Sequence, residues 1–139
     1  MDEQVNLPHW PPGTVCILAT GGEGPHAIPV STAVRASDRR IVFALGGRRG
    51  SLQRLREDPQ VALTVLAAGD VAFTAHGTAQ VIADPLSGLE GVVGVEISVD
   101  RLSSHTRPTF SIADGVAWSW ADDEARERDT AVRSALLEL

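Results

Sequence analysis

The stretch Gly46–Pro59, GGRRGSLQRLREDP, decides how the rest of the sequence is interpreted. It follows the apolar run Ile41–Leu45, which is rich enough in strand-forming residues to predict a β-strand. Glycines and two arginines then lead into a short helical pattern, in which Leu52 and Leu55 share one face. Pro59 ends this helix, because the residue before a proline is pushed out of helical geometry. The order is therefore a strand, a glycine-rich basic turn and a helix start.

Such an order suits an anion. The first amides of a helix have no partner within the helix and lie at the positive end of its dipole. Ser51 is the expected N-cap, and Arg48 and Arg49 add forked donors that match a phosphate group. The glycines allow the backbone to come close to that group. The alternative is that Ser51 only caps a short helix and that both arginines are solvated.

The length and composition limit the classes of protein to which this sequence can belong. The sequence has 139 residues, enough for one domain spanning residues 1–139, and 43% of them are hydrophobic. No run approaches the length of a membrane span, the first ten residues contain no apolar block of a secretory signal, and the net charge of −6 argues against nucleic acid as a partner. The single cysteine, Cys16, excludes an internal disulfide and a multi-cysteine zinc site. We therefore expect a cytoplasmic protein with no metal centre.

The residue types that are missing restrict the chemistry further. The sequence has no lysine, which excludes Schiff-base chemistry, and no tyrosine that could act as a general acid. All 12 basic residues are arginines, which stay charged and are poor proton donors. A chain with so few acid–base groups is better suited to hold a cofactor that performs the reaction itself.

Short apolar runs and stretches in which apolar and polar residues alternate predict six or seven strands, mostly antiparallel. The expected strands comprise residues 14–20, 26–35, 41–45, 60–67, 71–83 and 92–102. Pro29 cannot donate to a ladder and predicts a sheet edge, while Gly77 predicts a bulge or sharp bend inside the longest strand. Strands this long predict a closed barrel rather than a flat sheet.

The last third of the sequence predicts a hairpin and a helix. Residues 110–121 alternate around the turn dipeptide Asp114–Gly115, which is typical of a hairpin. Asp122 should cap a final amphipathic helix. The apolar stripe of that helix is expected to comprise Ala131, Val132, Ala135 and Leu136. For Trp118 and Trp120, packing in the core or at a subunit interface is favoured over stacking on a flavin.

In this order of features the sequence resembles the split-barrel flavin-binding family typified by pyridoxamine 5'-phosphate oxidase and its small actinobacterial members. The most specific part is RRGSLQRLREDPQVALTVL, Arg48–Leu66, and HGTAQVIAD, His76–Asp84, resembles the strand that follows. The resemblance implies a mainly β split barrel, and a homodimer with two FMN cofactors at the subunit interface. It assigns the FMN phosphate to Arg48, Arg49, Ser51 and Gln53, and the isoalloxazine ring to Ile28, Pro29, Val30 and Ser31.

Two departures from the family pattern limit what the resemblance implies. A lysine common at the position of Ser51 is missing, and the arginine-containing segment that pyridoxamine phosphate oxidases use for substrate has no match in the final RSALLEL. Oxidation of pyridoxamine phosphate is therefore not the expected activity. We expect a small FMN-dependent oxidoreductase whose small-molecule substrate and catalytic residues the sequence does not identify. A deazaflavin-dependent reductase, a haem-binding protein that uses His76 or His105, and a module without a cofactor remain alternatives.

The strand 41–45 gives a separate reason to expect a homodimer. Its residues are apolar on both faces, so both faces need cover. A single domain of this size covers mainly one of them, and a second subunit would cover the other.

Overall fold

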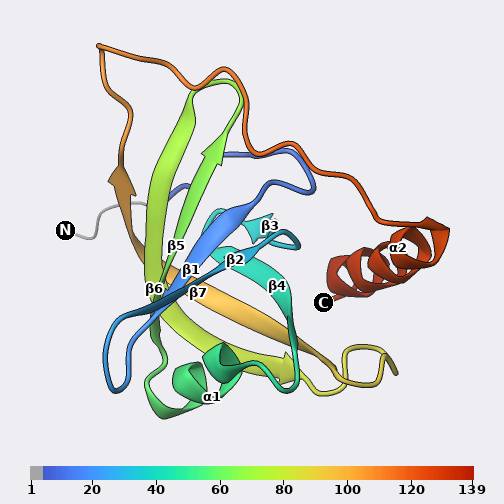
Figure 1. The fold of residues 1–139 in the computed structure, drawn as a ribbon. Helices are drawn as coiled ribbons and strands as arrows, with labels where there is room; N and C mark the ends of the chain where they lie inside the picture. The colour runs from blue at the N-terminus through green and yellow to red at the C-terminus, as the bar shows by residue number, and fades with distance from the viewer. Residues whose placement is uncertain (1–4) are drawn as a thin grey trace.

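The computed structural model describes residues 5–139, which form a mainly β fold of seven strands and two helices (Figure 1). The strands are β1 (Cys16–Thr20), β2 (His26–Val30), β3 (Val34–Ser37), β4 (Arg40–Gly46), β5 (Gln60–Ala67), β6 (Val71–Ala83) and β7 (Val92–Ser104). The helices are α1 (Gly50–Glu57) and α2 (Asp123–Leu137). Every pairing between these strands is antiparallel, in the order β2-β1-β5-β6-β7-β4-β3. The predicted fold class is confirmed.

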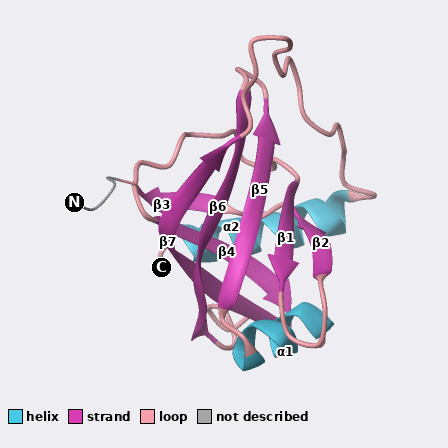
Figure 2. Ribbon diagram, turned by 90° about the vertical axis from the view of Figure 1, so that its left-hand side faces the viewer, coloured by secondary structure: helices cyan, strands magenta, loops and turns pink. Residues whose placement is uncertain are grey.

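The sheet curls into a barrel that is split between its two edge strands. β2 and β3 lie at opposite ends of the strand order, yet only residues 31–33 separate them in the chain. Figure 2 shows the strands wrapping around one interior, with α1 at one end of the barrel. Pro29 lies on the edge strand β2, as predicted, because an edge strand tolerates a missing donor.

The prediction of one continuous strand over residues 26–35 is wrong. The chain leaves one edge of the sheet at Val30 and joins the other edge at Val34, so β2 and β3 have different partners. Between them the amide of Ala44 donates to the Thr32 hydroxyl over 3.0 Å, which attaches the connection to β4. As a result the short helix follows the fourth strand rather than the third.

Gly77 bends the barrel where the sequence predicts it. The register between β6 and β7 shifts between His76 and Gly77, which is a bulge in the longest ladder of the sheet. A bulge adds twist and lets long strands curve around a core. This prediction is confirmed.

Two apolar clusters hold the fold together. The larger one fills the barrel interior, and its fully buried members include Phe43, Leu63 and Val95. The smaller one lies outside the barrel, where α2 packs on β4 through Val42 and Leu136. α2 therefore covers the second face of β4 within one chain, and that strand no longer requires a partner subunit.

The start of α2 is predicted correctly, but its apolar stripe only in part. The Asp122 carboxylate accepts the amide of Ala125 over 2.8 Å and caps the helix. Three of the four expected stripe residues are buried, namely Val132, Ala135 and Leu136. Ala131 is exposed instead, because the helix turns it away from β4.

The predicted hairpin over residues 110–121 is wrong. Residues 105–121, here named the strap, form no strand and run in an extended path across the β5–β6 turn to α2 (Figure 1). Asp70 holds the strap at both main-chain groups of Ile112: its amide donates to the carbonyl over 3.1 Å, and its carboxylate accepts the amide over 3.0 Å. Asp114 accepts the amide of Gly115 over 2.8 Å, so this turn dipeptide is satisfied locally without paired strands. Within residues 5–139 no helix is long and apolar enough to cross a membrane.

Candidate functional site

The turn of residues 46–51 is held by backbone hydrogen bonds, one within the turn and one to the loop before β7. The Arg49 amide donates to the Gly46 carbonyl over 3.1 Å, and the Gly47 amide donates to Gly91 over 2.7 Å. α1 begins at Gly50, with Arg49 at the N-cap position and no side-chain cap. The turn therefore leaves the amides at the start of the helix without an acceptor side chain.

The prediction that Ser51 caps α1 is wrong. Ser51 lies inside the first turn of the helix, because the helix starts one residue before it. Its side chain is buried, and its hydroxyl has no hydrogen-bond partner among the described residues. An unpaired buried hydroxyl is destabilising by about 1–3 kcal/mol, so a partner supplied by a ligand would relieve that penalty.

The turn is also positively charged. Arg48 and Arg49 are both exposed, and within residues 5–139 neither forms an ion pair. The first turn of α1 contains no acidic residue that would offset the helix dipole. Gln53 is exposed and points along the helix, where its amide donates to Glu57 over 3.2 Å. Of the four residues expected to bind phosphate, the two arginines and Ser51 are gathered at the turn, whereas Gln53 has a partner one helical turn farther on.

A groove of about 500 Å³ begins at this turn. Gly46 ends β4, belongs to the turn and also lines the groove, so the two features adjoin at this residue, whereas residues 47–51 do not line the groove. Residues 31–32 and 44–45 form the barrel wall, and the strap and α2 form the opposite wall. The lining from the strap and α2 comprises Trp118, Ser119, Trp120, Ala121, Ala125, Arg128, Asp129 and Val132.

The four residues expected beside a flavin ring do not share one face. Ser31 lines the groove. Ile28 packs against the barrel interior, Val30 is buried in it, and Pro29 is exposed on the other face of β2. Only Ser31 therefore offers its side chain to the groove.

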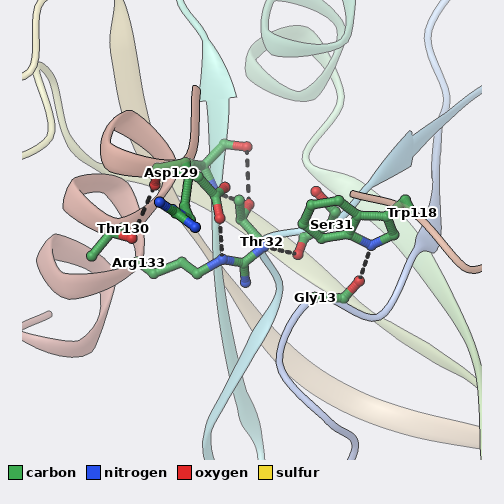
Figure 3. A network of polar contacts seen from close by, with 9 residues as sticks. Gly13, Ser31, Thr32, Trp118, Asp129, Thr130 and Arg133 are labelled. Carbon is green, nitrogen blue, oxygen red and sulfur yellow. Dashed lines mark hydrogen bonds and ion pairs between the residues drawn. The ribbon is translucent and has the colours of Figure 1, made fainter. Parts of the chain in front are cut away.

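Polar contacts fix both walls of the groove (Figure 3). Arg133 of α2 pairs with Asp129 over 2.6 Å and donates to the Ser31 carbonyl over 2.8 Å. Trp118 of the strap donates its indole N–H to the Gly13 carbonyl over 2.8 Å. The groove is therefore bounded by segments that are distant in the sequence and connected by hydrogen bonds.

The strap and α2 are the part of the site that sequence reasoning missed. The two tryptophans stood out in the sequence, but as packing residues. Asp129 and Arg133 carried no signal, because their spacing of four is that of any ion pair on a helix surface.

The histidines proposed for a haem alternative do not line the groove. His76 Nε2 lies 3.1 Å from the Ser103 hydroxyl, and His105 Nε2 lies 2.7 Å from the Thr74 hydroxyl. Partial burial, reinforced by the nearby Arg101 charge, lowers the pKa of His76 below its ordinary value. The part of the chain in the structure contains no group of three or more His, Cys, Asp or Glu side chains that could hold a metal ion.

Comparison with known proteins places this arrangement in a family. The family model described as pyridoxamine 5'-phosphate oxidase matches residues 10–94, which is more than half of the chain. The chain belongs to this family. The match includes the turn, α1 and the barrel wall of the groove, whereas the strap and α2 lie beyond it. No curated protein sequence matches the chain.

Solved structures of this oxidase family and its neighbours share the fold. A candidate pyridoxamine 5'-phosphate oxidase from Lactobacillus delbrueckii aligns with a TM-score of 0.57 at 14% identity, covering 66% of this chain and 84% of its own. A FAD-binding protein from Mesorhizobium loti gives 0.52 at 16%, covering 64% and 81%. An F420 reductase gives 0.55 at 16%, covering 66% and 90%. At these identities the likeness shows the fold alone.

Proposed function

We propose that this member of the pyridoxamine 5'-phosphate oxidase family is a small flavin-dependent oxidoreductase. It holds FMN with the phosphate at the 46–51 turn and the isoalloxazine ring in the adjoining groove. The observation that carries the proposal is that the turn and the groove adjoin at Gly46. One ligand with an anionic end and a flat aromatic end would occupy both at once.

At the phosphate end, three contributions favour an anion. The uncapped start of α1 provides backbone amides and the positive end of a dipole. Arg48 and Arg49 provide permanent charges that a lysine would otherwise supply at the position of Ser51. Ser51 adds a hydroxyl without a partner in the described residues, which is consistent with a phosphate oxygen as its missing acceptor. The residues present therefore fit the phosphate despite the missing lysine.

At the ring end, the groove is large enough for a small molecule and has aromatic walls. Its volume of about 500 Å³ is within the range of small-molecule sites, roughly 300–1,000 Å³. Trp118 and Trp120 are 40% and 42% exposed and line the groove, so part of each indole is accessible to a flat ring. Ser31 and Thr32 border the opposite side.

The residues that line the groove indicate which tasks the protein performs and which the cofactor performs. FMN, when bound, supplies hydride transfer. The described lining of the groove contains no histidine or cysteine, and its one carboxylate, Asp129, is paired with Arg133. The chain's own residues thus bind, orient and shield the reacting groups, and we assign none of them as a proton donor to the small-molecule substrate.

We further propose that the protein acts as a homodimer. Ile17 on β1 and Leu66 on β5 are 42% and 45% exposed and lie on the same outer face of neighbouring strands. Exposed apolar side chains grouped on a sheet face are typical of an interaction surface. A second copy of the chain is the partner we propose for this face.

An absorption spectrum tests the proposed cofactor. Titration of the purified full-length chain with FMN should give a perturbed flavin spectrum that saturates at one FMN per chain. Saturation with the deazaflavin coenzyme and not with FMN would replace the proposal by a deazaflavin reductase. A Soret band on addition of haem, or no uptake of any of the three, would replace it by a haem protein or by a module without a cofactor.

A further inference from the structure

Trp118 and Trp120 also line a second cavity, of about 360 Å³, which shares only these two residues with the proposed flavin groove. Pro11 and Pro12 of the N-terminal segment form one side of it, and the strap residues around Asp114 form the other. The two tryptophans therefore belong to the lining of both the groove and this cavity.

The charge of this second cavity is opposite to that of the turn. Asp114 is the one ionisable side chain in its described lining, which contains no arginine or histidine. One oxygen of that carboxylate accepts the amide of Gly115, which fixes the side chain at the cavity wall. An anion would be repelled here, and a cation would be attracted.

The aromatic part of the wall has a defined geometry. The ring centroids of Trp118 and Trp120 are 5.1 Å apart and their planes meet at 82°, so the two indoles form a corner. The hydrogen bond to the Gly13 carbonyl fixes Trp118. Gly13 has a φ of +84°, and a Cβ there would lie 3.1 Å from the Trp118 ring, so the close approach requires glycine. Indole faces attract cations through their quadrupole.

We propose that this cavity binds an organic cation with an apolar body, of the quaternary ammonium or alkylammonium class. The two indoles and the prolines would surround the methyl or methylene groups, and Asp114 would balance the charge. Trp118 and Trp120 line both sites, but the turn that we assign to the phosphate does not line the cavity, and the cation can be tested in the absence of flavin. Failure of one proposal would therefore leave the other standing.

Choline and its neutral isostere 3,3-dimethylbutan-1-ol are the probes, because they differ mainly in charge. The full-length chain is titrated with each and followed by the indole N–H resonances of its three tryptophans. Choline should shift the resonances of Trp118 and Trp120. Trp10 is the internal control, because its N–H donates to Ala33 and its ring packs against Phe73 in the core. We expect choline to bind on the order of tenfold more tightly than the alcohol.

Three variants assign the preference to the cavity. Asp114→Asn and Trp120→Leu should each remove most of the preference for choline over the alcohol, and Asp114 is exposed enough for its variant to fold normally. Glu127→Gln removes the same charge from an exposed site on α2 and should leave the preference unchanged. Equal affinity for the two probes, no saturable shift with choline, a shift of Trp10 alone, or an unchanged preference in Asp114→Asn would each overturn the proposal.

Discussion

The carbonyl group of Ser98 occupies the space where a Cβ atom on Gly77 would lie, with its carbon only 2.9 Å from that position. Any side chain at Gly77 would therefore push β7 away from β6 at the bulge. We expect Gly77→Ala to lower the free energy of unfolding by about 1–3 kcal/mol, as overpacking of a rigid backbone does. Urea denaturation measures the loss. The matched control is Gly50→Ala, because a Cβ at Gly50 meets nothing within 4 Å and alanine favours the start of α1, so its stability should be unchanged or slightly higher.

Two neighbouring leucines at the end of α2 test whether the helix stabilises the smaller apolar cluster outside the barrel. Leu136 is 1% exposed against β4, whereas Leu137 is 72% exposed. Leu136→Ala should destabilise the protein by about 2–5 kcal/mol, and Leu137→Ala by no more than about 0.5 kcal/mol. Equal melting temperatures for the two variants would show that α2 does not cover Val42.

The elements that were predicted well depend on local signals. β5 follows directly from a nearly continuous apolar run and β6 from alternating side chains, and α1 ends before Pro59 because a proline acts on its immediate neighbour. The split between β2 and β3 has no local signal, since both halves alternate and only the choice of pairing partner separates them. The hairpin predicted around Asp114–Gly115 is wrong for the same reason. A turn dipeptide makes a hairpin only where two strands can pair, and that depends on distant parts of the chain.

The candidate site likewise contains one part that the sequence predicts and one part that it does not. The turn with Arg48 and Arg49 is contiguous in sequence, so its pattern was recognisable. The groove beside it depends on contacts between distant segments, such as Arg133 with Ser31, 102 residues apart, and Trp118 with Gly13, 105 residues apart. No spacing rule relates such pairs, and these walls became visible only in the folded chain.

Cys16 should make the protein sensitive to alkali. Burial raises the pKa of its thiol to about 12, above the ordinary value of 9.0. Between these two values the unfolded chain releases a proton that the folded chain retains, so stability falls as the pH rises through this window. The sequence has no lysine or tyrosine to titrate there, which leaves the effect to Cys16. The melting temperature should fall from pH 9 to pH 11 in the parent protein and fall much less in Cys16→Ala; parallel slopes would contradict the assignment.

The proposed dimer face can be tested by adding charge to it. Light scattering should give twice the chain mass at micromolar concentration. Leu66→Arg should convert the protein to a monomer, because burying an unpaired guanidinium is unfavourable. Leu137→Arg places the same charge at an exposed site on α2 and should remain dimeric. A parent protein of single-chain mass would refute the dimer directly.

The decisive variant for the flavin site is Arg48→Ala combined with Arg49→Ala. Each charge-assisted contact to a phosphate contributes about 1.5–3 kcal/mol, so the loss of both should weaken FMN binding by about two to four powers of ten. Riboflavin lacks the phosphate, and its affinity should change little. Stability should also change little, because exposed arginines contribute little to folding.

The control for that variant must replace arginines that do not line the groove. Arg128 lines it, so the matched pair is Arg107→Ala with Arg126→Ala, both exposed and outside it. This pair removes the same two positive charges, and FMN binding should stay within about twofold of the parent, since exposed charges that do not contact the ligand are largely screened by salt. Fluorescence quenching of each flavin gives the affinities of the parent and of both double variants. If FMN and riboflavin lose affinity equally in Arg48→Ala/Arg49→Ala, or if neither loses any, the turn does not bind the phosphate, and Arg48 and Arg49 are only solvated residues at a helix start.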